Sequence, residues 1–165
     1  MVKKAFTLIE LIFVIVILGI LASVAIPRFS GLVDNSKKSA VKSTINAVLT
    51  SIENIHGQWI INENMKTFKG ADGVEHNLNE NGYPEQLDEG ANTSRVFSYV
   101  IKNAVPSCNG GKTNGCWREP STNEYEYYFN EGKILKVDYN AATGTFECKD
   151  GINFSEEECN HTIFG

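Results

Sequence analysis

The chain opens with a long apolar run. From Phe6 to Ile26 it reads FTLIELIFVIVILGILASVAI, in which only Thr7, Glu10, Gly19 and Ser23 interrupt large apolar side chains and alanines. At about 1.5 Å per residue, these 21 residues match the roughly 30 Å hydrocarbon core of a bilayer. A single segment satisfies its own backbone in lipid only as a helix. The pattern therefore predicts one transmembrane helix at residues 6–26.

Two polar features give this helix an orientation and a possible role. Lys3 and Lys4 precede the run, and the positive-inside rule keeps them cytoplasmic, so the rest of the chain lies outside. Glu10 lies within the run, where a charge at mid-helix depth costs roughly 2.5–3.5 kcal/mol. An acid in such a place implies a partner of opposite charge.

Two simpler interpretations compete. A secretory signal cleaved after Ala25 has the small residues that cleavage needs, but its apolar region is shorter and carries no acid. It would release the remainder, for example as a secreted enzyme. A plain signal anchor would leave Glu10 without a role and the chain as a membrane-tethered binding or sensor domain.

The stretch KKAFTLIELIFVIVILGILASVAIP, Lys3 to Pro27, resembles the N-terminus of type IV prepilins and type II secretion pseudopilins. The resemblance implies a leader at residues 1–5, cleavage by prepilin peptidase between Ala5 and Phe6, and N-methylation of Phe6. Ala5 departs from the glycine that the family usually has. Glu10 would pair with the N-terminal amine of a neighbouring subunit, because two opposite charges desolvated together cost less than one alone.

The resemblance also implies the partners and location of the chain. These are other pilin or pseudopilin subunits, prepilin peptidase and an ATP-driven assembly platform in the bacterial inner membrane. Before assembly the subunit would cross that membrane once, with a cytoplasmic N-terminus and a periplasmic head. Afterwards it would lie in a periplasmic or extracellular filament, whose helices loosen near Pro27. Gly19 is a second soft point in the helix.

Past Pro27 the pattern becomes amphipathic. Apolar residues recur at three- and four-residue steps, which predicts that the helix continues over residues 27–61 and ends near Trp59. We expect a small sheet to pack on this apolar stripe. The stripe consists of Phe29, Leu32, Val33, Ala40, Val41, Ile45, Val48, Leu49, Ile52, Ile55 and Trp59. Lys37, Lys38 and Lys42 occupy the other faces.

Residues 62–165 form the predicted head. Its first part, to about Ser107, is rich in turn residues, with a brief helix expected near Arg95–Lys102. The runs Glu124–Phe129, Lys133–Tyr139 and Thr145–Cys148 then predict an antiparallel meander of three or four strands. Its face toward the helix should draw on Tyr125, Tyr127, Phe129, Ile134 and Val137. The fold class is thus α+β.

The four cysteines, Cys108, Cys116, Cys148 and Cys159, all lie in the head. An even number outside the cytoplasm predicts disulfides, and their spacing fits no common zinc motif. Four cysteines allow three connectivities. We favour Cys108 with Cys116 and Cys148 with Cys159, because each pair closes a loop within one segment. The second loop resembles the C-terminal disulfide loop of many type IV pilins.

Charge is unevenly distributed. Residues 1–60 have a net charge of +3 and residues 61–165 a net charge of −8. An acidic head argues against general binding of nucleic acid. Near the C-terminus, hard oxygen ligands at Asp150, Asn153, Glu156, Glu157 and Glu158 form a candidate calcium site, although a solvated acidic loop has the same composition. In the family that the N-terminal stretch resembles, major pseudopilins use calcium in this part of the head.

No catalytic motif of the Walker, GxSxG or HExxH type occurs, and the three histidines are isolated. We therefore predict a structural subunit rather than an enzyme. The sequence leaves open whether the filament is an adhesion and motility pilus, a DNA-uptake pilus or a secretion pseudopilus.

Overall fold

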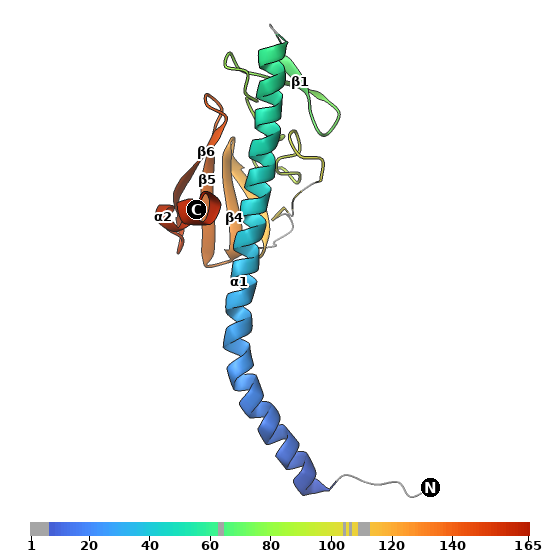
Figure 1. Ribbon diagram of the computed structural model, residues 1–165, viewed down its shortest axis with the longest axis vertical. Helices are drawn as coiled ribbons and strands as arrows, with labels where there is room; N and C mark the ends of the chain where they lie inside the picture. Colours follow the sequence, from blue (N-terminus) through green and yellow to red (C-terminus); the bar gives the residue numbers. More distant parts are fainter. Residues whose placement is uncertain (1–6, 63–64, 104, 106, 109–112) are drawn as a thin grey trace, which may run out of the picture. The chain divides into compact units, whose positions relative to one another are not determined.

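The computed structural model describes residues 7–62, 65–103, 105, 107–108 and 113–165 (Figure 1). Two compact units divide the chain, one ending at Ser36 and the other running from Lys37 to Gly165. The long helix α1, Leu8–Ile61, contributes to both. Phe6, the predicted methylation site, lies outside the described residues.

The first unit contains the N-terminal part of α1, which stays helical through Pro27. The predicted long helix is therefore confirmed, and Pro27 does not end it. Proline removes one hydrogen bond from a helix, but a helix of this length retains the bonds on either side.

In the second unit, α1 forms one wall of the core. Val41, Ile45, Val48 and Ile52 recur at four-, three- and four-residue steps, and all are fully buried. They belong to one hydrophobic cluster with Val137 and the other inward-facing residues of the sheet. Burying each such side chain stabilises the fold by roughly 1.5–3 kcal/mol, so this stripe is what fixes the helix to the head.

The stripe packs over a shorter length than its sequence pattern predicts. Leu32 and Val33 are 64% and 50% exposed and lie in the first unit. The longest strands, of eight residues, span about 26 Å, which matches only about 18 helical residues. The apolar stripe is longer than the sheet that covers it.

The main sheet is an antiparallel meander in the order β3-β4-β5-β6. Its strands are β3, Cys116–Ser121; β4, Glu124–Asn130; β5, Lys133–Asn140; and β6, Thr145–Ile152. The predicted strands are confirmed, each running on by one or more residues, and Tyr125, Tyr127, Phe129 and Val137 belong to the core cluster as predicted. Ile134 is buried but lies on the opposite face of the sheet, where it pairs with Tyr128. The helix α2, Glu156–Ile163, follows and lies beside β6 (Figure 1).

Between α1 and the main sheet, the chain forms a two-stranded sheet from β1, Thr67–Lys69, and β2, Glu75–Asn77. The helix predicted near Arg95–Lys102 is wrong, because this segment consists of turns. Phe97 adopts a positive φ of 61°, a left-handed conformation that an α-helix does not tolerate. The backbone N–H of Phe97 donates to Asp88 Oδ2 instead, at 2.9 Å.

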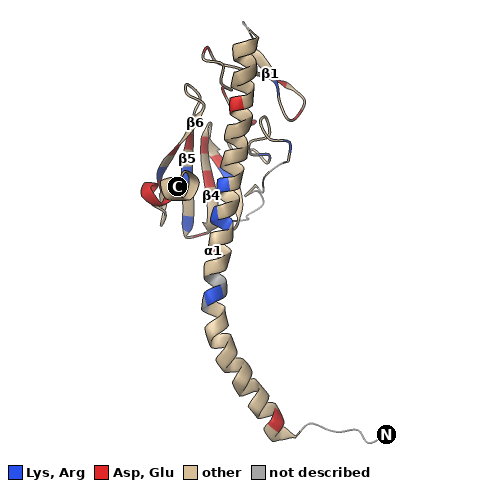
Figure 2. Ribbon diagram, in the orientation of Figure 1, with Lys and Arg blue, Asp and Glu red and all other residues tan. Residues whose placement is uncertain are grey.

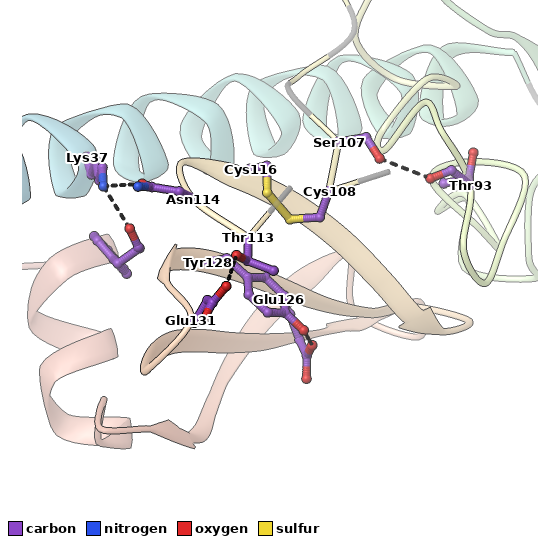
Figure 3. Close-up of a disulfide and its surroundings, with 11 residues drawn as sticks. Lys37, Thr93, Ser107, Cys108, Thr113, Asn114, Cys116, Glu126, Tyr128 and Glu131 are labelled. Atoms are coloured by element: carbon purple, nitrogen blue, oxygen red, sulfur yellow. Dashed lines mark hydrogen bonds between the residues drawn. A yellow bond between two sulfur atoms is a disulfide. The ribbon is translucent and has the colours of Figure 1, made fainter. Parts of the chain in front are cut away.

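Both predicted disulfides are present, Cys108–Cys116 and Cys148–Cys159. The first joins the segment before β3 to the start of β3, as Figure 3 shows. The second joins β6 to α2. Each bridge therefore fastens an edge of the sheet to an adjacent segment.

Candidate functional site

The N-terminal part of α1 is the candidate functional surface. Its described large apolar side chains, from Leu8 at 76% to Ile26 at 69%, are all exposed within the chain. Between Glu10 and Arg28 it carries no charged residue, and Figure 2 shows this stretch without charge. The helix is long and apolar enough to cross a membrane. A helix that is apolar all round needs lipid or protein around it.

Glu10 lies in the first turn of this helix. Its backbone N–H donates to Thr7 Oγ1 at 3.3 Å, so Thr7 caps the helix at its start. Among residues 7–62 and the other described segments, no basic side chain forms an ion pair with Glu10. Glu10 thus places a carboxyl group on an otherwise apolar, exposed stretch of helix, and its assembly role stays a prediction.

Gly19 lies on the same helix with open space at the position of a missing Cβ. A small residue there allows another helix to approach closely. Ala5 and Phe6, the predicted cleavage site, lie outside the described residues. The assembly roles assigned to Gly19 and Pro27 stay predictions.

The predicted calcium ligands lie near the end of β6, in the turn that follows it and in the first turn of α2. Asp150 Oδ1 accepts the backbone N–H of Glu156 at 3.0 Å, and Asn153 Nδ2 donates to the carbonyl oxygen of Gly132 at 2.7 Å. Ser155 Oγ caps the helix by accepting the N–H of Glu158 at 3.1 Å. In the part of the chain that the structure describes, no three His, Cys, Asp or Glu side chains form a group suited to a metal ion. Calcium binding by Asp150, Asn153, Glu156 and Glu157 stays an untested prediction.

Three lysines of α1 have contacts that the sequence pattern did not predict. Lys37 Nζ donates to Asn114 Oδ1 and to the carbonyl oxygen of Phe129 at 2.7 Å (Figure 3). Lys38 pairs with Glu158 of α2, and Lys42 donates to the carbonyl oxygen of Gly165. The sequence feature that could have indicated these contacts is the cluster of lysines on α1 in a chain whose head is acidic. Within the second unit, these contacts bind the helix to the head by polar groups as well as by its apolar stripe.

Glu158 accepts from two lysines, Lys38 at 2.8 Å and Lys133 at 3.2 Å. The hydrogen bond from Lys38, more than that from Lys133, lowers the pKa of Glu158. Because the folded state lowers this pKa, the stabilisation is present above the ordinary value of 4.5 and is lost as the pH falls. The cluster thus stabilises the docking of α2 at neutral pH.

We expect Glu158→Gln to lower the free energy of unfolding by about 0.5–1 kcal/mol at low salt, because the pair is partly exposed and screened. Denaturant unfolding of the full chain in detergent measures it. Glu157→Gln is the matched control, since Glu157 forms no ion pair with the described residues. Equal midpoints for the two variants would show that the lysine contacts contribute nothing.

The comparisons with known proteins concern the N-terminal part of the chain. Residues 1–26 match the family model of the prokaryotic N-terminal methylation motif. The type IV narrow pilus major component PilA5 of Thermus thermophilus is 53% identical over 45 residues, 27% of this chain and 39% of that protein. The type IV major fimbrial protein FimA of Dichelobacter nodosus is 45% identical over 51 residues, 31% of this chain and 33% of that protein.

The type IV major pilin protein PilA of Myxococcus xanthus is 46% identical over 49 residues, 30% of this chain and 22% of that protein. The chain thus spans well under half the length of the curated relatives it matches. No solved structure matches it significantly. An apolar helix with a single acid near its start, a methylation motif over the same residues and the α+β head that follows them are thus the features of this chain that resemble type IV pilins, and the sequence likeness is confined to the N-terminal part.

Proposed function

We propose that this chain is a structural, non-enzymatic subunit of a type IV pilus-like filament, assembled through the N-terminal part of α1. The observation that carries the proposal is the apolar surface of residues 8–26, exposed on all sides and interrupted by one acid, Glu10. Lipid covers such a surface before assembly, and the helices of other subunits cover it afterwards. The likeness to PilA5, FimA and PilA supports a filament subunit.

The proposed sequence of events begins in the inner membrane. Prepilin peptidase removes residues 1–5 on the cytoplasmic side, and Phe6 becomes the methylated N-terminus. An assembly platform then moves the helix from lipid into the filament. There Glu10 meets the amine of Phe6 of a neighbouring subunit, which neutralises the one charged side chain of the apolar surface.

The competing function is a membrane-tethered binding or sensor domain that does not polymerise. It would use the same apolar helix as an anchor, but it assigns no role to Glu10. Within the filament proposal, the relatives named above are pilus or fimbrial proteins, which favours a pilus over a secretion pseudopilus. Surface filaments seen by electron microscopy, and their loss on deletion of the gene, test that choice.

Processing provides the direct test. We expect the protein extracted from membranes to have the intact mass of a chain that begins at Phe6 and carries one added methyl group. An Ala5→Gly variant is the matched control, because it restores the residue usual in the family and should give the same mature mass. A mature chain beginning at Ile26 would contradict the proposal, and an unprocessed chain would favour the tethered domain.

A further inference from the structure

Two carboxylic acids are fully buried in the head. Asp88, in the segment between β2 and β3, is 0% exposed, and Glu119, in β3, is 1% exposed. Alternation along β3 puts Glu119 on the same face as Trp117, toward the core. Acidic side chains are almost never buried to this degree unless they are paired.

The hydrogen bonds of the two side chains differ. Asp88 Oδ1 accepts the N–H of Gly90 at 3.0 Å, and Asp88 Oδ2 accepts the N–H of Phe97 at 2.9 Å. Glu119 Oε1 accepts the N–H of Asn123 at 2.9 Å, whereas Glu119 Oε2 accepts from no described donor. Each oxygen of Asp88 thus has a backbone N–H donor. Glu119 Oε2 is buried without a donor among the described residues, and a proton of its own would allow it to donate to Asp88, whose side chain influences the pKa of Glu119.

In the part of the chain that the structure describes, the titratable groups that influence the pKa of Glu119 and Tyr125 are acids and phenols, namely Asp88, Glu119 and Tyr139. Arg95 interacts with Tyr99 and Asp72, but its guanidinium pairs with Glu89. Tyr125 is 1% exposed, and its hydroxyl has no partner among the described residues.

The nearest basic residues along the chain are engaged elsewhere. Arg95 pairs with Glu89, and Arg118 donates to Asn92 Oδ1 at 3.2 Å. Two adjacent carboxylates in a buried site cannot both stay ionised without a cation. Burial first, and then the hydrogen bond and charge of Asp88, raise the pKa of Glu119 to about 8.

We propose that Asp88 and Glu119 form a proton-dependent clasp, in which one shared proton holds segment 88–97 against β3 and whose loss as the pH rises opens that segment. The clasp fastens both ends of the segment. Asp88 binds the N–H groups of Gly90 and Phe97, and the carbonyl oxygen of Glu119 accepts the N–H of Asn92 at 2.7 Å.

Phe97 is the part of the core that the clasp controls. It is fully buried, and its ring lies 4.5 Å from that of Tyr125 and 5.3 Å from that of Trp117, measured between centroids. Its left-handed backbone, at φ 61°, is held by the hydrogen bond to Asp88. Without that bond the strained residue is free to relax, and its ring leaves the aromatic cluster.

The direction of the pH effect follows from the proton. The closed segment binds a proton that Glu119 releases when the segment opens and its pKa returns to the ordinary 4.5. The ratio of closed to open segment is therefore constant below that pH. It falls by up to about tenfold per pH unit above it, and levels off above about pH 8.

Amide hydrogen exchange of the full chain in detergent, corrected for intrinsic exchange rates, tests the clasp. We expect the protection of the Phe97 and Gly90 amides to fall in this way in the wild type. Glu119→Gln keeps a hydrogen-bond donor toward Asp88 but has no proton to lose, so its protection should stay constant with pH. Asp88→Asn should leave both amides weakly protected at every pH.

Two further results decide the matter in the wild-type protein alone. The carboxyl carbon resonance of Glu119 should titrate far above pH 4.5, and a midpoint near 4.5 would overturn the proposal. Calcium chloride added at pH 9 should not restore the protection of Phe97. If calcium restored the protection, a bound cation rather than a proton would hold the pair, and the proposal would be overturned. An equal pH dependence in the wild type and Glu119→Gln would also refute the clasp.

Discussion

Replacing Glu10 with leucine is expected to abolish filament formation while leaving the amount of protein in the membrane unchanged or higher. Glu10 is the one charge between the start of α1 and Arg28. Its removal makes insertion more favourable, because a charge at mid-helix depth costs roughly 2.5–3.5 kcal/mol. The two effects have opposite signs, and a plain membrane anchor predicts only the first.

The loss of assembly follows from the amine of Phe6 in the neighbouring subunit. In the proposed filament this amine loses its counter-charge while it stays in an apolar environment. An uncompensated buried charge costs roughly 3–5 kcal/mol, and the cost recurs at every subunit of the filament. Growth of the filament would therefore stop, whereas the stability of the head would not change.

The measurement is filament yield at matched membrane levels. Ser23→Leu is the control, since it also raises the apolarity of the helix, and the Ser23 hydroxyl donates to the carbonyl oxygen of Ile20 within its own helix. Glu10→Asp keeps the charge and should retain part of the yield. If Glu10→Leu assembles as well as Ser23→Leu, Glu10 does not have the role proposed for it.

The sequence pattern predicted those elements in which local signals and tertiary packing agree. The apolar run and the stripe from Val41 to Ile52 have helical periodicity, and both lie in α1. Strands β4 and β5 combine aromatic and β-branched residues around a short turn containing glycine. Local disulfides were predictable because each pair of cysteines is separated by only 8 or 11 positions.

Other elements depend on contacts that no local pattern contains. Strand β3 reads CWREPS, with two charged residues and a proline that cannot donate to a sheet; β4 pairs along one side of it, and an isolated bridge from Ser107 to Trp117 lies on the other. Strands β1 and β2 have three residues each, too few to show alternation. The turns at 95–102 replace a helix because Asp88, nine positions before Phe97, binds its backbone.

The polar residues of the head show the same limit. Glu119 is fully buried, although composition places glutamate on the surface, because its partner Asp88 comes from a distant segment. Lys37, Lys38 and Lys42 appear as a solvated helix face until the partners are known. The sequence pattern thus predicts the exposure of a polar residue correctly only when that residue has no partner from a distant segment.

Removing the disulfide between Cys148 and Cys159 is expected to cause the second large effect, on stability rather than assembly. Cys148→Ala with Cys159→Ala opens a loop of sequence separation 11, and loop entropy alone predicts a loss of about 3 kcal/mol in the free energy of unfolding. Both sulfurs are in the core, with Cys159 fully buried. The helix α2 has eight residues, too few to be stable by itself.

The matched control is Cys108→Ala with Cys116→Ala, because its loop has a similar separation of 8 and loop entropy predicts nearly the same loss. Denaturant unfolding of the full chain in detergent, followed by near-ultraviolet circular dichroism of the head's aromatic residues, compares the two. We expect the Cys148–Cys159 variant to lose more, because α2 is then held only by non-covalent contacts, such as the burial of Ile163 and the Glu158 ion pairs. Equal losses would show that both bridges act only on the unfolded chain and that α2 docks without its covalent link.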